Sequence, residues 1–293
     1  MSTQDVVVVG VDGSPESDAA VAWAAKEAVQ LDAVLRIVHV WHAPSYPTDP
    51  VLSLPAERSV LVTDAAALAA ATNPQVRCET VTRSGLPSIT FIELSAGASL
   101  IVLGGHHRNV LDRMVFGSVT THILSQASCP VVVVRTGTVR QSLSAPGPVV
   151  VGVDHEGTSD DAVEFAFDYA DAHGVDLVAV QAWTAHELAT GDDGDPRTIR
   201  SVQDSLAESL RLLHEKYPQV RVITAAACET PVNALLDWAD RASMLVVGSR
   251  GRGYFTGMLL GSVSAAVAHQ AACSVTVVRP RTVSQLLDAL DER

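Results

Sequence analysis

Glycines and hydroxyl residues are spaced for anion binding near the C-terminal end of this chain. An apolar run breaks at Gly248, glycine returns at Gly251 and Gly261, and Ser262 and Ser264 follow. Glycines let backbone N–H groups approach a phosphate closely, and a helix that begins after Gly-Ser adds unpaired N–H donors and the positive end of its dipole. We therefore expect a phosphate-binding loop and helix here, with the two hydroxyls as donors or as ligands of Mg2+.

The first half carries the same arrangement with one substitution. Gly104 ends an apolar run and Gly117 and Ser118 return further on, but His107 stands where the second glycine belongs. A Cβ at a position that needs positive φ costs on the order of 1 kcal/mol, and the imidazole takes up space. We therefore expect the second half to hold the stronger site, while a protonated His107 in contact with a phosphate is the open alternative.

The two halves align along most of their length, which makes the chain an internal duplication. Val7–Asp12 recurs unchanged as Val149–Asp154, and the offset stays constant apart from two inserted residues. A stretch rich in Ser, Gly and Pro separates the halves. We expect a first domain over residues 1–136, a linker over 137–147, a second domain over 148–281 and a helical tail over 282–293.

Short β-branched runs alternate with alanine-rich stretches in each half, a pattern typical of βαβ units. With right-handed crossovers, this predicts an α/β fold of two repeated, doubly wound, open parallel five-stranded sheets with helices on both faces. In the first half we expect strands over 5–11, 35–41, 76–82, 99–104 and 130–135, and helices over 17–30, 57–71, 87–96 and 118–127.

Several helix starts can be predicted from residue type. Pro87 and Pro231 suit the first turn of a helix. Serine is a favoured N-cap because its hydroxyl accepts a free backbone N–H. We expect serine caps at Ser17, at Ser159, and at Ser118 or Ser262.

Two end-of-strand features converge in each half. In open α/β sheets, ligands bind at the carboxyl edge where the strand order reverses. If the order is 3-2-1-4-5, the reversal brings Asp12 beside Gly104 and Asp154 beside Gly248. The carboxylate can accept a hydrogen bond from a base or a ribose, or it can serve as a turn or N-cap residue after its strand; the sequence leaves both readings open.

The spacing Gly248-x2-Gly251-x9-Gly261-Ser262 resembles the nucleotide signature of the universal stress protein family in its tandem two-domain form. Gly10–Ser14 is also typical of it, and the resemblance covers 5–136 and 147–281. It implies ATP-binding domains with strand order 3-2-1-4-5 that pair through their last strands. The candidate nucleotide-binding residues are Asp12, Val40, Gly104, Gly117, Ser118, Val119 and Thr120 in the first half and Asp154, Ala182, Gly248, Gly251, Arg252, Gly261, Ser262, Val263 and Ser264 in the second.

The second half departs from the pattern as well, because His155–Glu156 replaces Gly13–Ser14. The leading hypothesis is an ATP-binding regulator or sensor of the stress response with at most slow hydrolysis. The alternatives are a nucleotide-independent scaffold with vestigial crevices and an enzyme related to adenine-nucleotide α-hydrolases. No catalytic set is identifiable, and the chain has no Walker-type loop.

Charge and composition exclude several partner classes. The net charge is −13 and the chain has only two lysines, which disfavours binding to nucleic acid or anionic membranes. No apolar run approaches the ~20 residues of a membrane span, and no signal sequence is recognisable. The cysteines show no zinc spacing, and Cys129 and Cys273 are predicted to be small buried residues. We expect a cytoplasmic protein without a metal site.

The last strands would expose apolar edges if left alone. Val131–Val134 is a continuous valine run, and Val275–Val278 is apolar apart from Thr276. We therefore expect these two strands to pair within one chain, and two chains to associate through other faces as a homodimer.

Overall fold

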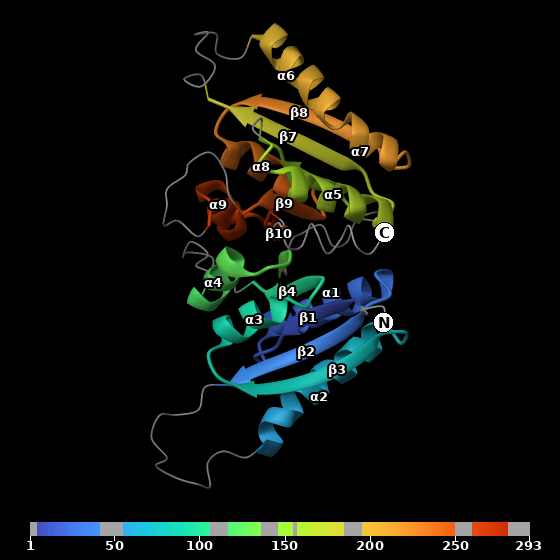
Figure 1. Ribbon diagram of the computed structural model, residues 1–293, viewed down its shortest axis with the longest axis vertical. Coiled ribbons are helices and arrows are strands. Elements are labelled where there is room, and N and C mark those ends of the chain that lie inside the picture. Colours follow the sequence, from blue (N-terminus) through green and yellow to red (C-terminus); the bar gives the residue numbers. More distant parts are fainter. Residues whose placement is uncertain are drawn as a thin grey trace. The chain divides into compact units, whose positions relative to one another are not determined.

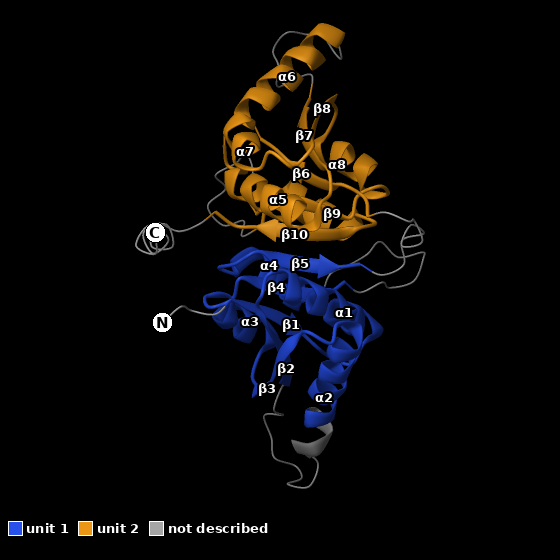
Figure 2. Ribbon diagram, turned by 90° about the vertical axis from the view of Figure 1, so that its right-hand side faces the viewer, with its two compact units in different colours: residues 1–136 blue, residues 137–293 orange. Residues whose placement is uncertain are grey.

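The computed structural model describes residues 5–41, 55–105, 117–135, 146–154, 157–184, 195–249 and 260–280. The chain divides into two compact units, Met1–Thr136 and Gly137–Arg293 (Figure 2). Among the helices within these ranges, none combines the length and apolar composition needed to cross a bilayer.

The first unit is one parallel sheet with helices on both faces (Figure 1). Its strand order is β3-β2-β1-β4-β5, and neighbouring strands are parallel, which confirms the predicted topology. Helix α1 packs against α2, and α3 packs against α4. The elements are β1 (Val6–Gly10), α1 (Pro15–Gln30), β2 (Val34–Trp41), α2 (Pro55–Thr72), β3 (Arg77–Ser84), α3 (Pro87–Ser95), β4 (Leu100–Gly104), α4 (Ser118–Gln126) and β5 (Val131–Val134).

The second unit repeats this topology, with strand order β8-β7-β6-β9-β10. Its extra feature is a break that divides the helix after the second strand into α6 and α7. The elements are β6 (Val149–Gly152), α5 (Asp160–His173), β7 (Leu177–Trp183), α6 (Pro196–Ser209), α7 (Arg211–Lys216), β8 (Val222–Cys228), α8 (Pro231–Ala239), β9 (Met244–Gly248), α9 (Ser262–Gln270) and β10 (Ser274–Val278).

The central strands are buried on both faces, as their continuous valine runs predict. Val7–Val9 of β1 and Val149–Val151 of β6 are fully buried. Each fully buried valine contributes roughly 1.5–3 kcal/mol of hydrophobic stabilisation relative to an exposed one. Cys129 and Cys273 are buried as well, as predicted.

The prediction that Ser17 caps the first helix is wrong. Helix α1 begins at Pro15, and Ser14 is its N-cap, with its hydroxyl accepting the backbone N–H of Ser17 at 3.2 Å. Proline suits this first position because its φ is already helical and its missing N–H would be unpaired there. The Ser17 hydroxyl instead donates to the Ser14 carbonyl at 2.8 Å.

The predicted serine caps of the last helices are wrong too. The N-caps of α4 and α9 are Gly117 and Gly261, and neither makes a side-chain cap bond. Ser159 does occupy the N-cap position of α5, but its hydroxyl does not cap the helix. Pro87 and Pro231 begin α3 and α8 as predicted.

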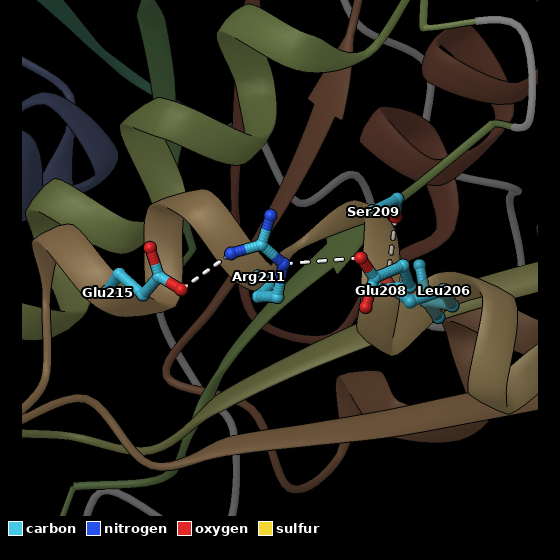
Figure 3. A network of polar contacts seen from close by, with 5 residues as sticks. All are labelled: Leu206, Glu208, Ser209, Arg211 and Glu215. Atoms are coloured by element: carbon cyan, nitrogen blue, oxygen red, sulfur yellow. Dashed lines mark hydrogen bonds and ion pairs between the residues drawn. The ribbon is translucent and has the colours of Figure 1, made fainter.

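The break between α6 and α7 lies at Leu210. Just before it, the Ser209 hydroxyl donates to the Leu206 carbonyl at 2.7 Å, a local bond that competes with regular helical hydrogen bonding. Across the break, Arg211 lies between Glu208 and Glu215, at 3.2 and 2.6 Å (Figure 3). These side chains are exposed, so each ion pair adds little stability.

Candidate functional site

The carboxylate of Asp12 is engaged in the turn between β1 and α1. Its Oδ1 accepts the backbone N–H of Ser14 at 3.0 Å and the Ser14 hydroxyl at 2.5 Å. Ser14 in turn caps α1. The turn reading of Asp12 therefore holds in the structure, but an ionised carboxylate accepts about four hydrogen bonds, so these two do not exhaust it.

Asp154 is held more tightly at the corresponding end of β6. Its Oδ1 accepts the backbone N–H of Thr158 at 3.0 Å and the Ser159 hydroxyl at 3.2 Å. Its Oδ2 accepts the Thr158 hydroxyl. The pKa of neighbouring Asp160 is raised, mainly by burial and then by the negative charges of Asp154 and Asp161. Because the Thr158 and Ser159 hydroxyls already donate to Asp154, a ligand donor would compete with both of them.

Two signature glycines of the first unit have different surroundings. A Cβ on Gly104 would lie 2.5 Å from the backbone carbonyl of Glu16 and 2.8 Å from the backbone nitrogen of Ser17. A Cβ on Gly117 would meet no atom of the described residues within 4 Å. Gly104 is therefore required for the packing of α1 on β4, whereas no described residue packs closely against Gly117.

In the second unit, backbone hydrogen bonds fix where the glycine-rich segment begins and ends. The N–H of Gly261 donates to the Ser249 carbonyl at 2.8 Å, and the N–H of Ser249 donates to the Val278 carbonyl at 2.7 Å. The buried Ser264 hydroxyl donates to the Gly248 carbonyl. Ser262 is exposed, so its hydroxyl is the one that this helix end presents to solvent.

The described helices differ in how their first turns are capped, and the N-caps of α4 and α9, like those of α3, α5 and α7, make no side-chain cap bond. Side chains cap α1, α6 and α8 through Ser14, Asp195 and Thr230. At α4 and α9 the N-cap is glycine, so the N-cap residue itself offers no side chain to the backbone N–H groups of the first turn. These groups, together with the helix dipole, are suited to hold an anion.

The remaining candidates lie at the same edges of the two sheets. Val40 and Ala182 are half-buried near the ends of β2 and β7, Val119 is exposed and Val263 half-buried in the first turns of α4 and α9, and Thr120 is half-buried beside exposed Ser118. Gly251 and Arg252 lie outside the described residues, as do His107, His155 and Glu156.

The part of the chain that the structure describes contains no group of three or more His, Cys, Asp or Glu side chains placed to hold a metal ion. His39, the histidine of the first unit that precedes Val40, lies with its Nδ1 2.8 Å from the Val11 carbonyl. Because a carbonyl only accepts, this contact assigns the proton to Nδ1.

Sequence reasoning missed the polar partners of the two aspartates. The signal for Ser14 was present, because an Asp two residues before a Ser favours a turn in which the carboxylate accepts local donors. Trp183 and Ser249 were also missed: each is almost fully buried and has a side-chain polar atom without a hydrogen-bond partner in the part of the chain that the structure describes. Burial of this kind depends on tertiary packing.

The fold and its strand-end sites define a tandem of doubly wound parallel α/β domains, each with a glycine-capped helix beside an acidic strand end. The model of the universal stress protein family matches residues 4–135 and 147–279. The chain therefore belongs to the universal stress protein family.

Relatives share this organisation over nearly their whole length. A universal stress protein of Mycobacterium tuberculosis (strain ATCC 25618 / H37Rv) is 38% identical over 289 residues, covering 94% of this chain and 97% of that protein. One from Mycolicibacterium smegmatis is 38% identical over 305 residues, covering 96% and 99%. The crystal structure of a universal stress protein from Archaeoglobus fulgidus has the same fold, with a TM-score of 0.69 at 19% identity, over 96% of this chain and 98% of that one.

Proposed function

We propose that this protein binds ATP, chiefly in its second unit, and acts as a nucleotide-dependent regulator or sensor in the stress response. One observation carries the proposal. The glycine–serine signature, complete in the second unit, ends at the N-terminus of α9, whose N-cap Gly261 has no side chain to cap the first turn.

The residues of the second unit fit the polyphosphate of ATP. The backbone N–H groups of Ser262–Ser264 can donate to phosphate oxygens, and Gly251 and Arg252 belong to the same signature segment. The exposed Ser262 hydroxyl can donate to a phosphate or bind Mg2+ if the cation accompanies ATP. Asp154, at the end of β6, is the acceptor proposed for the ribose or base.

The first unit is proposed as the weaker site. Gly104 is required by the packing of α1, so its presence carries no information about phosphate. His107 replaces the second glycine of the signature, whereas Gly117 remains at the N-cap of α4 with no described residue within 4 Å of its Cβ position. We therefore expect about one ATP per chain, with His107 as the residue that separates the two sites.

The test combines nucleotide stoichiometry with a matched pair of substitutions. Nucleotide released from denatured, purified protein is quantified by chromatography, and ATP affinity is measured by calorimetry for the wild type, Gly261→Glu and Gly117→Glu. A carboxylate at the phosphate position repels ATP, so Gly261→Glu should abolish binding and Gly117→Glu should have little effect. Unchanged affinity in Gly261→Glu would show that the site is assigned wrongly.

A nucleotide-independent scaffold is the second candidate function. The observation that favours it is the local use of both strand-end carboxylates, Asp12 by Ser14 and Asp154 by Thr158 and Ser159. Under this reading the crevices are vestigial and the surfaces of the two units bind partners. Partner binding that changes with added ATP would exclude it.

Three expectations from the sequence accompany the proposal. They are the pairing of the two repeats through their last strands, a homodimer and a cytoplasmic location. Separate expression of residues 1–136 tests the first, because an isolated unit with an uncovered last strand should self-associate.

A further inference from the structure

The second strand of each unit ends with a polar residue and a tryptophan two positions apart. In the first unit these are His39 and Trp41, and in the second unit Gln181 and Trp183. His39 contacts the Val11 carbonyl at 2.8 Å, and Trp41 also has an interaction partner. In the second unit, neither the Gln181 amide nor the Trp183 indole N–H has a hydrogen-bond partner among the described residues.

Trp183 is 4% exposed, and its indole Nε1–H is buried without a hydrogen-bond partner among the described residues. An indole nitrogen can only donate, so an acceptor has to come from outside the described protein groups. Buried donors without an acceptor are unfavourable and uncommon in native proteins. Gln181, half-buried on the same strand, has no hydrogen bond within the described residues.

The location of these groups links them to the proposed nucleotide site. Within the described part of the second unit, the buried side-chain polar atoms without a partner are Trp183 Nε1 and Ser249 Oγ. Trp183 ends β7, and Ser249 follows the end of β9. These strands flank β6, whose end carries Asp154. The unsatisfied groups therefore gather at the carboxyl edge where a ligand of this fold binds.

Strand geometry decides which side chains at the end of β7 can read a base. Consecutive residues point to opposite faces, so Gln181 and Trp183 share one face and Ala182 lies on the other. Ala182 offers only a methyl group and its backbone, so side-chain recognition at this strand end falls to Gln181 and Trp183.

The chemistry of the pair favours one base. A glutamine amide can accept from the N6 amino group of adenine while donating to N7, whereas guanine presents two acceptors, O6 and N7, at the same edge. We propose that Gln181 and Trp183 read the base of the nucleotide in the second unit and select adenine over guanine, with the Trp183 indole N–H donating to a ring nitrogen. This inference rests on the proposed function and adds its specificity-determining residues.

The test measures the affinities of the full-length protein for ATP and GTP in three variants. Gln181→Leu keeps the side-chain volume but removes the amide, and it should lower the ratio of ATP to GTP affinity about tenfold or more. Trp183→Phe removes the indole N–H and should weaken ATP about fivefold. His39→Leu, at the matching position of the first unit, is the control and should leave the affinity ratio unchanged.

A second readout covers the case in which Trp183→Phe does not fold. The indole N–H resonance of Trp183 in the wild type, assigned through its loss in a Trp183 variant or by selective labelling, should shift when ATP saturates the protein. An unchanged affinity ratio in Gln181→Leu, or an unmoved resonance at saturation, would overturn the inference.

The result also separates this inference from the proposed function. ATP binding that Gly261→Glu abolishes but Gln181→Leu leaves equally selective would refute base reading and keep the function. A wild type that binds neither ATP nor GTP would refute both. A loss of selectivity in Gln181→Leu, combined with unchanged ATP affinity in Gly261→Glu, would support base reading and refute the phosphate assignment.

Discussion

Replacement of Gly104 by alanine should destabilise the first unit rather than simply remove a phosphate contact. Gly104 ends β4 and occupies the first glycine position of the nucleotide signature. In the structure its Cα lies against the first turn of α1, where a Cβ would come within 2.5 Å of the Glu16 carbonyl and 2.8 Å of the Ser17 nitrogen. These are backbone atoms, so no side-chain rotation can relieve the clash.

The magnitude follows from how far α1 would have to move. Ordinary contact begins at 3.4 Å, so the first turn must retreat by about 0.9 Å, the difference between 3.4 and 2.5 Å. Helix α1 is anchored by fully buried alanines, Ala20, Ala24 and Ala28, that leave little freedom to shift. Overpacking of this kind costs about 1–3 kcal/mol, and we expect a value near the upper end.

The assay is urea unfolding followed by tryptophan fluorescence, with Trp23 and Trp41 reporting on the first unit. Gly117→Ala is the matched control, because its Cβ meets no atom of the described residues within 4 Å and its φ of −59° suits any residue. That substitution should change the unfolding free energy by less than about 0.5 kcal/mol. A Gly104→Ala protein as stable as the Gly117→Ala protein would refute the packing argument.

Three further substitutions test other parts of the structure by urea unfolding. Gly174→Ala should lose about 1 kcal/mol, because its φ of +62° strains a residue with a Cβ although no described atom lies within 4 Å of that Cβ; a loss above about 3 kcal/mol would contradict a purely backbone cause. Thr276→Val should leave the free energy of unfolding unchanged or higher, because among the described residues the buried Thr276 hydroxyl donates to a weak acceptor, Met244 Sδ. The first unit has Val132 at the corresponding position. A clear loss of stability would show that the bond to Met244 matters. Burial raises the pKa of the Cys129 thiol to about 12. In the unfolded chain this thiol ionises at about pH 8.5, whereas in the folded protein it stays protonated. Its contribution to the free energy of unfolding is therefore complete below that pH and falls by about 2 kcal/mol by pH 10. A Cys129→Ala protein should lack this part of the pH dependence. If the unfolding free energy falls equally steeply with pH in the wild type and in the variant, Cys129 is not the cause.

The strand order was predictable because it depends on patterns repeated along the chain. Continuous valine runs identify central strands, and the alternation of strands with alanine-rich helices restricts the topology. The N-cap of α1 was predicted at Ser17, whereas in the structure it is Ser14. The decisive local signal was Pro15, which favours the first helical position and so makes the residue before it the cap.

The candidate site was only partly predictable, because several roles depend on contacts between distant segments. The spacing of the glycines identifies the segments, but it does not reveal that Gly104 lies against the backbone of Glu16. It likewise cannot show that the Ser264 hydroxyl donates to Gly248 rather than to solvent or a ligand. Those roles come from the packing of a helix on a strand end.

A duplicated chain offers a physical way to separate residues that the fold requires from residues that a ligand requires. A polar group that the fold needs should be satisfied by protein atoms in both copies, because an unsatisfied buried donor is costly wherever it lies. At the end of the second strand, Trp41 of the first unit has an interaction partner, whereas the indole Nε1 of the matching Trp183 has no hydrogen-bond partner among the described residues of the second unit. Both copies also have a glycine N-cap without a side-chain cap bond, at α4 in the first unit and at α9 in the second. The second unit thus has a glycine-capped helix, α9, and a buried donor without a described acceptor, Trp183 Nε1, where the base is proposed to bind. For this reason we expect ATP to bind to the second unit first.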